Sequence, residues 1–426
     1  MTTGSRATLY VGIASLALPS ADEGADHAPV RTVTDAALLV ADGHIVAAGP
    51  RVDVEAQAAQ PKRVDLGGCA VVPGLVDSHT HLVFAGSRAD EMERRSRGET
   101  YEQIAQAGGG IVRTVEAVRH TSDEELLRLA EARLAAMLAR GVTTLEVKSG
   151  YDLTVHDELR MLRVARRLGT KVPLDIRTTL LAHVIPIARR VEREAYVHEL
   201  CEELIPQAAA EKLADYIDVF VETGAFTADD ARTIVHAATS LGLRAKVHVD
   251  QLRDSDGAAL AAELGALSAD HLEFVSATGR AHLARAGVVA TVLPGCALFL
   301  GKGPWPDGRA LRDAGCEVAV ATDYNPGSSM VRDLGLCATL AATRCGLTVQ
   351  EALWGITRGG AKALGLFDRG TLAAGERADF VVIEADDWRA LLYEAGHARV
   401  QAVYVGGRRV VPTSHATRRS PRSTRH

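Results

Sequence analysis

The sequence of 426 residues contains no apolar run long enough to cross a membrane. Its longest run, Val288–Leu300, is interrupted by Pro294 and Gly295. The six cysteines include no C-x-x-C pair and stand mostly in apolar runs, which predicts small core residues in a reducing compartment. We therefore expect a protein without a membrane partner and without a disulfide framework.

Excess basic charge is also missing, since 48 Lys and Arg residues stand against 54 Asp and Glu residues. The net charge of −6 gives no reason to expect a nucleic-acid partner. A secretory signal is not recognisable either, because Thr8–Leu18 follows a single basic residue and lacks a clear small-x-small cleavage site. We interpret this run as a first β-strand and expect a cytoplasmic protein.

The middle of the chain alternates short strand patterns with longer amphipathic segments. The predicted strands are Val71–Phe84, Val142–Ser149, Asp175–His183, Tyr216–Glu222, Arg244–Asp250, Leu267–Glu273, Val288–Leu293 and Glu317–Asp323. The predicted helices between them include Ser122–Arg140, Asp157–Leu168 and Ala228–Leu241. Eight strands with helical crossovers form a parallel sheet, and eight is the number that closes a barrel. The predicted fold class is therefore α/β, with a (β/α)8 TIM barrel at its centre.

The two ends of the chain have a different pattern, with short alternating runs and turn signals before Val72 and after Gly370. We expect these ends to pair into one smaller β-sandwich domain built from both termini. The predicted domains are residues 1–72 with 368–411 for the β-sandwich, 73–367 for the barrel, and 412–426 for a flexible tail.

The segment His79-Thr80-His81 ends the first predicted strand of the barrel. Alternate residues of a strand share a face, so both imidazoles are expected to point the same way and to supply half of a metal site. A single His-X-His is a weak motif, and two unrelated core or surface histidines would give the same pattern.

Further polar residues stand at the carboxyl ends of the later predicted strands. They include the run Lys148–Tyr151 and the single residues His183, His248, His271 and Asp323. In a barrel, these ends surround one mouth, where such enzymes place their active sites. So many histidines at strand ends favour a catalytic site over chance placement.

Several longer blocks strengthen this interpretation. They are Pro73–Phe84, Gly86–Arg88, Tyr101–Ile104 with Gly108–Ile111, Glu146–Tyr151, Asp218–Phe226, Asp270–Glu273 and Ala321–Ser329. With these blocks the chain resembles the amidohydrolase superfamily and, within it, the imidazolonepropionase family, from about residue 40 to residue 410. The resemblance implies hydrolytic ring opening of 4-imidazolone-5-propanoate to N-formimidoyl-L-glutamate in histidine degradation.

The resemblance assigns His79, His81, His248 and Asp323 to one divalent metal ion. Nitrogen and oxygen ligands of this kind suit Zn²⁺ or Fe²⁺. Relatives with two metals usually carry a bridging lysine at the end of the fourth strand, where this chain has Phe220-Val221-Glu222. We therefore expect a single metal, which would make hydroxide available near neutral pH.

Three residues are the candidates for the catalytic step. Asp323 could take the proton of the attacking water and later pass it to the departing nitrogen, while His271 could orient the hydroxide or polarise the carbonyl. Gln251 can hydrogen-bond the substrate ring but cannot act as a base. Whether Asp323 or His271 is the main proton carrier stays open at this point.

The resemblance also implies a small-molecule substrate with a carboxylate arm. Arg88 could pair with that carboxylate, although a surface ion pair is the simpler interpretation. After the last strand, the turn containing Asn325, Gly327 and Ser328 could present the N-terminus of a helix to an anion, or could be an ordinary turn. Tyr151 and His183, together with Gln251, are expected to contact the ring. Barrels of this type often form dimers, so a homodimer is expected.

Three departures from the family pattern bear on specificity. They are Asp152 in place of a glycine, the segment Leu181–Ile187, and Cys296–Leu298, which lacks an expected tyrosine. None of these departures falls on a predicted metal ligand.

Two other functions fit part of the pattern. One is an aminohydrolase that releases ammonia from a heterocycle, which would need no carboxylate clamp. The other is a barrel without catalytic activity that has a structural role, although every expected ligand is present here.

Overall fold

The computed structural model describes residues 7–21, 29–99, 103–104, 107–301, 303–397 and 399–411. The predicted tail 412–426 and the motif residues Tyr101 and Glu102 lie outside these residues. Two sheets organise the described chain, one with eight strands and one with seven. None of its helices is long and apolar enough to span a membrane.

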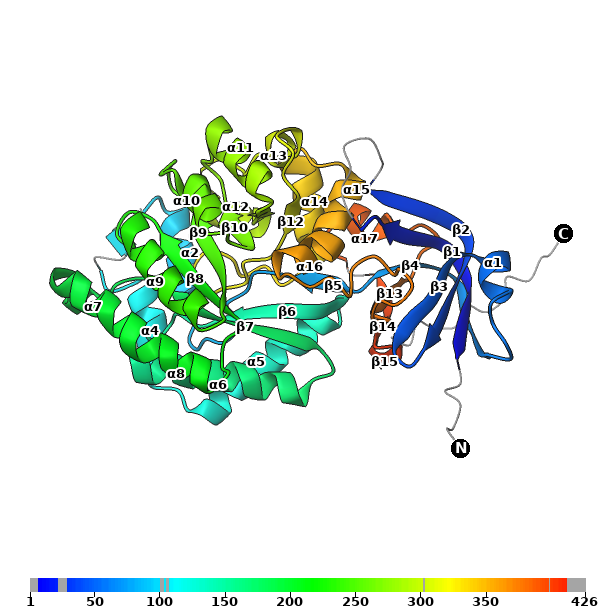
Figure 1. Ribbon diagram of the computed structural model, residues 1–426, viewed down its shortest axis with the longest axis horizontal. Coiled ribbons are helices and arrows are strands. Elements are labelled where there is room, and N and C mark those ends of the chain that lie inside the picture. Colours follow the sequence, from blue (N-terminus) through cyan, green and yellow to red (C-terminus); the bar gives the residue numbers. More distant parts are fainter. Residues whose placement is uncertain are drawn as a thin grey trace.

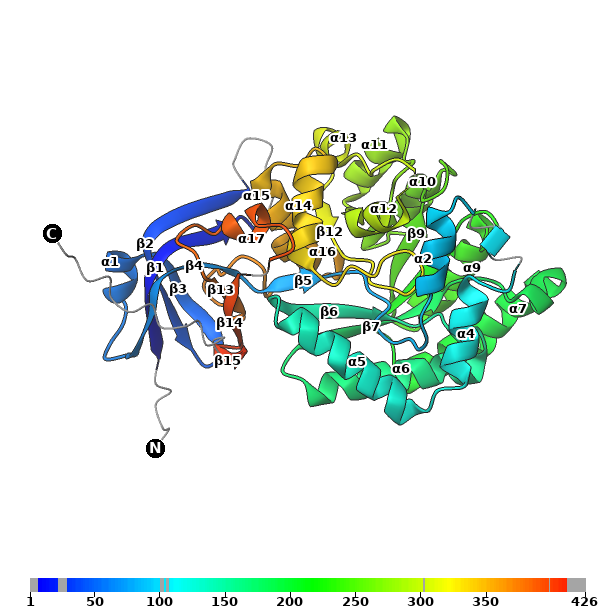
Figure 2. The same cartoon turned by 180° about the vertical axis from the view of Figure 1, so that it is seen from behind.

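The eight-stranded sheet follows the order of the chain, with each strand parallel to the next. Its strands are β5 (Leu75–Asp77), β6 (Val142–Lys148), β7 (Asp175–Ala182), β8 (Tyr216–Val221), β9 (Arg244–Val249), β10 (Ser268–His271), β11 (Val289–Val292) and β12 (Val318–Val320). The prediction of a (β/α)8 barrel is confirmed. Figure 2 shows helices such as α5 and α6 on the outer side of this sheet.

The barrel closes where its first and last strands meet. Asp77 at the end of β5 accepts hydrogen bonds from Thr322, one from the backbone N–H at 3.1 Å and one from the hydroxyl at 2.7 Å. The backbone then pairs beyond the strands, since the N–H of Asp323 donates to His79 O and the N–H of His81 donates to Tyr324 O. Burial raises the pKa of Asp77 to about 7, against the effect of these hydrogen bonds. The contacts place Asp323 beside the two histidines of the motif.

The prediction of one strand over Val71–Phe84 is wrong. β4 (Lys62–Pro73) belongs to the seven-stranded sheet, and after Gly74 only Leu75–Asp77 joins the barrel. Gly74 lies where the chain passes very close to β6, because a Cβ there would lie 2.3 Å from Thr143 Oγ1. His79-Thr80-His81 therefore follows the strand instead of ending it.

The helices lie between the barrel strands and at a few other connections. They are α1 (Arg51–Glu55), α2 (Ala89–Ser96), α4 (Ile111–Arg119), α5 (Asp123–Leu138), α6 (Val155–Lys171), α7 (Arg193–Glu199), α8 (Ile205–Ala210), α9 (Ala228–Ser240), α10 (Gly257–Glu263), α11 (Ala277–Ala286), α12 (Pro294–Leu300), α13 (Gly308–Asp313), α14 (Leu334–Arg344), α15 (Val349–Trp354), α16 (Gly360–Ala363) and α17 (Ala390–Tyr393). Shorter turns of 3-10 or π type cover Ile187–Glu192, Leu200–Leu204 and Gly355–Gly359.

The three long predicted helices are present as α5, α6 and α9. Ser122 caps α5, and Thr227 caps α9 in a reciprocal arrangement with Asp230, as helix-start residues of these types do. For α6 the cap is Thr154, three residues before the predicted start at Asp157.

The seven-stranded sheet joins the two ends of the chain, as the sequence predicts. Its order is β15 (Arg408–Val411), β14 (Val400–Val405), β13 (Phe380–Ile383), β4, β1 (Thr8–Pro19), β2 (Val30–Ala41) and β3 (His44–Pro50). β13 pairs antiparallel with β4, and the rings of Tyr10, Phe380 and Tyr404 pack together in a separate small core. Figure 1 shows the first strands (blue) and the last strands (red) together at one end of the molecule, beside the barrel.

Candidate metal and catalytic site

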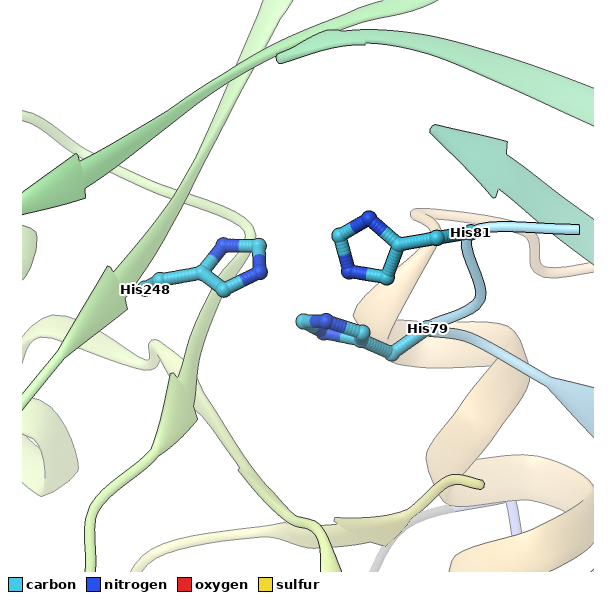
Figure 3. A group of neighbouring side chains, drawn as sticks. All are labelled: His79, His81 and His248. Atoms are coloured by element: carbon cyan, nitrogen blue, oxygen red, sulfur yellow. The ribbon is translucent and has the colours of Figure 1, made fainter. Parts of the chain in front are cut away.

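Three histidines from the ends of the first and fifth strands of the barrel converge on one space. His79 and His81 follow β5, and His248 lies near the end of β9 (Figure 3). One ring nitrogen from each lies within 4.8 Å of the others, and all three side chains are buried. The structure therefore brings together three of the four residues predicted as metal ligands.

Asp323 and His271 join the same cluster. Asp323 Oδ1 lies 3.5 Å from Nε2 of His79 and 3.5 Å from Nε2 of His81. Two ligands of one tetrahedral zinc ion lie about 3.4 Å apart, given metal–ligand bonds of about 2.1 Å. His271 and Asp323 both have a positive φ, 86° and 51°, a strained conformation that recurs at functional sites. The cluster thus has the spacing of residues that share one ion.

In His79 and His248, a carboxylate binds one ring nitrogen and the other ring nitrogen is left for a divalent metal. Nδ1 of His79 lies 2.7 Å from Asp270 Oδ2, and Nδ1 of His248 lies 3.0 Å from Asp218 Oδ1. Their Nε2 atoms are buried and have no hydrogen-bond partner among the described residues. Carboxylates on Nδ1 place the lone pair of a neutral imidazole on Nε2, which is the atom a metal binds.

The protonation states of His79, His248 and Asp323 are those that metal ligands need. Burial lowers the pKa of His79 well below its usual value, and the neighbouring Lys148 lowers it further. Burial also lowers the pKa of His248, although Asp218 opposes this effect. For Asp323, burial acts to raise the pKa, but the surrounding histidines outweigh it and hold the pKa below its usual range. Neutral imidazoles and an ionised carboxylate are the ligand forms that a divalent metal requires.

Below the histidines, five charged side chains fill the inside of the barrel. This ionic layer consists of Glu146 and Lys148 on β6, Asp218 on β8, Lys246 on β9 and Asp270 on β10, all with no exposed surface. Four of these residues, all but Lys246, lie in the sequence blocks that resemble the family. Lys148 was expected at the mouth of the barrel, and none of the four was predicted to form a layer of charges inside it. The alternation of Glu146 with Lys148, and of Lys246 with His248, was the available signal, since residues two apart share a face.

The turn after β12 holds Asp323 in place. Asn325 Nδ2 donates to the carbonyl of Asp323 at 2.6 Å, and the Ser328 hydroxyl donates to Asp323 Oδ2 at 3.1 Å. Of the two possibilities left open for this segment, the structure has the turn, because the next helix begins at Leu334. The N–H groups of Gly327 and Ser328 already donate to Asn325 Oδ1, both at 2.8 Å. In this structure they are engaged by the turn's own side chain.

Arg88 is buried at this turn and forms an ion pair, with Nη2 2.8 Å from Glu91 Oε2. The ion pair named as the simpler interpretation is therefore present, but it is buried and does not lie on the surface. Its guanidinium approaches Gly327 so closely that a Cβ there would lie 2.5 Å from Arg88 Nη1. Glu91, also buried, accepts from Arg88 Nε at 2.9 Å and from the N–H of Gly110 at 2.8 Å. Glu91 therefore fixes the orientation of the guanidinium against the turn.

Tyr151 and His183 lie beside His81, one of the three clustered histidines. The ring of His81 is 5.7 Å from that of Tyr151 and 5.7 Å from that of His183, measured between centroids. His183 Nδ1 donates to the carbonyl of Gly150 at 3.0 Å, and burial lowers the pKa of His183 to about 3. The ring is therefore neutral near pH 7.

The remaining predicted residues are Gln251 and His271. Gln251 is partly buried, and its Nε2 lies 4.0 Å from Sγ of Cys296. Nδ1 of His271 lies 3.5 Å from Glu273 Oε1; burial alone lowers the pKa of His271, but Glu273 outweighs it and raises that pKa. Among the predicted catalytic groups, His271 is thus the one with a carboxylate positioned to hold its proton.

Comparison with known proteins agrees with this geometry. A sequence model of the amidohydrolase family matches residues 107–411. An imidazolonepropionase from Deinococcus radiodurans is 48% identical over 405 residues, covering 94% of this chain and 98% of its own. An imidazolonepropionase from Myxococcus xanthus is 48% identical over 372 residues, covering 87% and 88%. The chain belongs to the imidazolonepropionase family of amidohydrolases.

Membership confirms the family predicted from the sequence blocks, and with it a hydrolase that acts on a cyclic amide bond. Among solved structures, an adenosine deaminase from Xanthomonas campestris with bound zinc has a TM-score of 0.70 at 20% identity, covering 95% of this chain and 93% of that one. At this identity the likeness supports the fold alone. Within the imidazolonepropionase family, the histidine cluster described above is the place for a divalent metal.

Proposed function

We propose that the protein opens the ring of 4-imidazolone-5-propanoate at the amide C–N bond by hydrolysis and forms N-formimidoyl-L-glutamate, as a step of histidine degradation. The observation that carries this proposal is the buried Arg88 at Gly327, on the turn that also holds the proposed metal ligand Asp323. A fixed guanidinium at this place can pair with a carboxylate arm of the substrate. The imidazolonepropionases that match most of the chain support the same reaction.

The metal ligands in this proposal are His79, His81, His248 and Asp323, and they hold one ion, Zn²⁺ or Fe²⁺. The unpartnered Nε2 atoms of His79 and His248 and the 3.5 Å spacings of His79 and His81 from Asp323 support this set. No lysine stands at Phe220–Glu222 to bridge a second ion. The zinc in the adenosine deaminase of the same fold favours zinc as the first metal to test. When bound, such an ion lowers the pKa of a water molecule so that hydroxide forms near neutral pH.

Proton transfer in this proposal uses His271 and Asp323. The Nδ1 side of His271 faces Glu273, so the opposite side of the ring is available to the reacting centre. His271 polarises the substrate carbonyl, and Asp323 accepts the proton of the attacking water and delivers it to the departing ring nitrogen. Gln251 positions the substrate by hydrogen bonds and takes no proton, because an amide is not a base.

Substrate contacts come from the surrounding loops. Arg88 binds the carboxylate, with Asn325, Gly327 and Ser328 shaping that end of the pocket. Tyr151 and His183 contact the ring, as their places beside His81 support.

We also place the enzyme in the cytoplasm, working as a homodimer on a small molecule. All six cysteines are free and buried, which supports a reducing compartment. The dimer is an expectation from the barrel type, and sedimentation or sizing of the purified protein tests it.

The decisive experiment follows the ultraviolet absorption of the imidazolone with purified protein, before and after treatment with a chelator. We expect decay that stops when the metal is removed and returns when Zn²⁺ or Fe²⁺ is added. Ammonia is measured in parallel, because ring opening to N-formimidoylglutamate releases none, whereas an aminohydrolase releases one per turnover. If a metal-loaded sample left the absorption unchanged, the proposed reaction would be wrong.

A further inference from the structure

The ionic layer is unusual for the inside of a barrel. The interior of a (β/α)8 barrel is ordinarily filled by branched apolar side chains. Here three carboxylates and two ammonium groups, with a net charge of −1, are completely buried directly below the metal histidines. Burying charges without a purpose is costly, so their arrangement needs a physical reason.

The contacts divide the layer into two parallel chains of groups. Lys148 Nζ donates to Asp218 Oδ2 at 2.6 Å, and the other oxygen of Asp218 holds Nδ1 of His248 at 3.0 Å. Lys246 Nζ lies 3.5 Å from Asp270 Oδ2, the atom that holds Nδ1 of His79 at 2.7 Å. Lys148 therefore contacts Asp218, which contacts His248. In the same way Lys246 lies near Asp270, which contacts His79.

Glu146 connects the two chains. Its Oε1 accepts from Lys148 at 2.9 Å and from the hydroxyl of Thr179 at 2.5 Å, and its Oε2 lies 3.5 Å from Lys246. Lys246 is anchored in addition by the carbonyl of Ser78, at 3.0 Å. Lys148 also approaches Asp270, but only to 3.9 Å, so its main partner in the histidine chains is Asp218.

We propose that Lys148 is a positioning residue for His248: it fixes the carboxylate of Asp218, and Asp218 in turn fixes the imidazole with Nε2 toward the metal. Lys246 orients His79 through Asp270 in the same way, and Glu146, which lies between the two lysines, fixes their positions relative to each other. This inference rests on the proposed metal site.

The test is the affinity of the full-length protein for Zn²⁺, measured by competition with a chromophoric chelator, which does not depend on turnover. Lys148→Met removes the charge and keeps most of the side-chain length. Loss of a group that orients a metal ligand typically lowers affinity about 10- to 100-fold, and we expect a loss in this range. A purely structural role would lower the melting temperature of the metal-free protein and leave the zinc affinity of the folded protein unchanged.

Two double-mutant cycles identify the route of the effect. If Lys148 acts through Asp218, Lys148→Met weakens zinc binding little in an Asp218→Asn background. In the matched Asp270→Asn background, Lys148→Met has nearly its full effect. Equal, additive effects in both backgrounds would contradict the proposed route.

The remaining outcomes are also decisive. If Lys148→Met fails to fold, the double variant Lys148→Met/Asp218→Asn keeps the net charge of the layer. Its zinc affinity is then compared with that of Asp218→Asn alone. Equal affinities support the proposal, and a further large loss contradicts it. If the wild type binds zinc and Lys148→Met binds it equally well, only the role of Lys148 is refuted. A wild type that binds neither Zn²⁺ nor Fe²⁺ refutes the metal site itself.

Discussion

Gly327→Ala is the most specific test of the carboxylate site. The φ of Gly327 is not in the left-handed region, so the backbone accepts alanine without strain. The added Cβ, however, would lie 2.5 Å from Nη1 of Arg88 and 3.1 Å from its Cζ. An ordinary contact begins near 3.4 Å, so the guanidinium must withdraw by about 0.9 Å. Arg88 is buried and held by Glu91, and it therefore has little freedom to move without losing its alignment.

The expected cost follows from the interaction that is displaced. A hydrogen bond to a charged group contributes about 1.5–3 kcal/mol, which corresponds to a factor of about 10–150 in binding. A misplacement of about 1 Å can have an effect of similar size on catalysis. We therefore expect KM for 4-imidazolone-5-propanoate to rise about 10- to 100-fold. The metal content and the melting temperature should stay close to those of the wild type.

Steady-state kinetics and a substrate variant test this expectation. An analogue without the carboxylate should be processed equally, though poorly, by the wild type and by Gly327→Ala. Gly169→Ala is the matched control, because the nearest atom to its added Cβ would be at 3.5 Å, an ordinary contact. If Gly327→Ala had an unchanged KM, Arg88 would not be the group that binds the carboxylate.

Two further predictions concern histidines of the site. His271→Ala should keep its metal and lose about 10²- to 10⁴-fold in kcat, as expected for a residue that assists proton transfer; normal turnover would remove it from the mechanism. For His183 the folded-state pKa is about 3, against about 6.5 in an unfolded chain, so the unfolded state binds the extra proton between these values. Its contribution to stability is complete above pH 6.5 and is lost as the pH falls toward 3, by at most about 2 kcal/mol between pH 6.5 and pH 5. Urea unfolding of the metal-free protein should therefore depend less on pH in His183→Gln, and equal slopes would contradict this.

Most of the architecture was predictable because it rests on local pattern. β-rich runs alternating with amphipathic helices predicted the number and order of the barrel strands and the positions of seven of them, and cap residues such as Ser122 and Thr227 stand where their helices begin. The grouping of His79, His248 and Asp323 followed from one rule, since the carboxyl ends of parallel strands meet at the same mouth. These inferences needed only the identity and order of the elements.

What sequence could not supply depends on contacts between distant segments. Pro73-Gly74 lies in a continuous apolar run, and the strand is seen to divide there only from its partners, since Pro73 pairs with Phe380 and Leu75 pairs with Val142. The turn at Asn325 has the composition of a helix start, and Asn325 Oδ1 accepts from the N–H groups of Gly327 and Ser328 as an N-cap residue does. The chain nevertheless does not continue as a helix from this point, since the next helix begins at Leu334. The ionic layer was missed because Lys148 and Asp218 are 70 residues apart, and each alone has the pattern of an ordinary strand residue.

The departures from the family pattern can be separated by where their side chains point. Asp152 is fully buried and pairs with Arg119 at 2.9 Å and with Arg160 at 3.3 Å, both from the outer helices α4 and α6. Its charge is therefore used to attach the Tyr151 loop to those helices. Cys296, by contrast, contacts Gln251, a proposed substrate residue, and burial raises the pKa of its thiol well above the usual value. A neutral thiol beside the Gln251 amide changes the shape of the surroundings of Gln251 and adds no charge. Any shift in substrate specificity should therefore originate at Cys296 and not at Asp152.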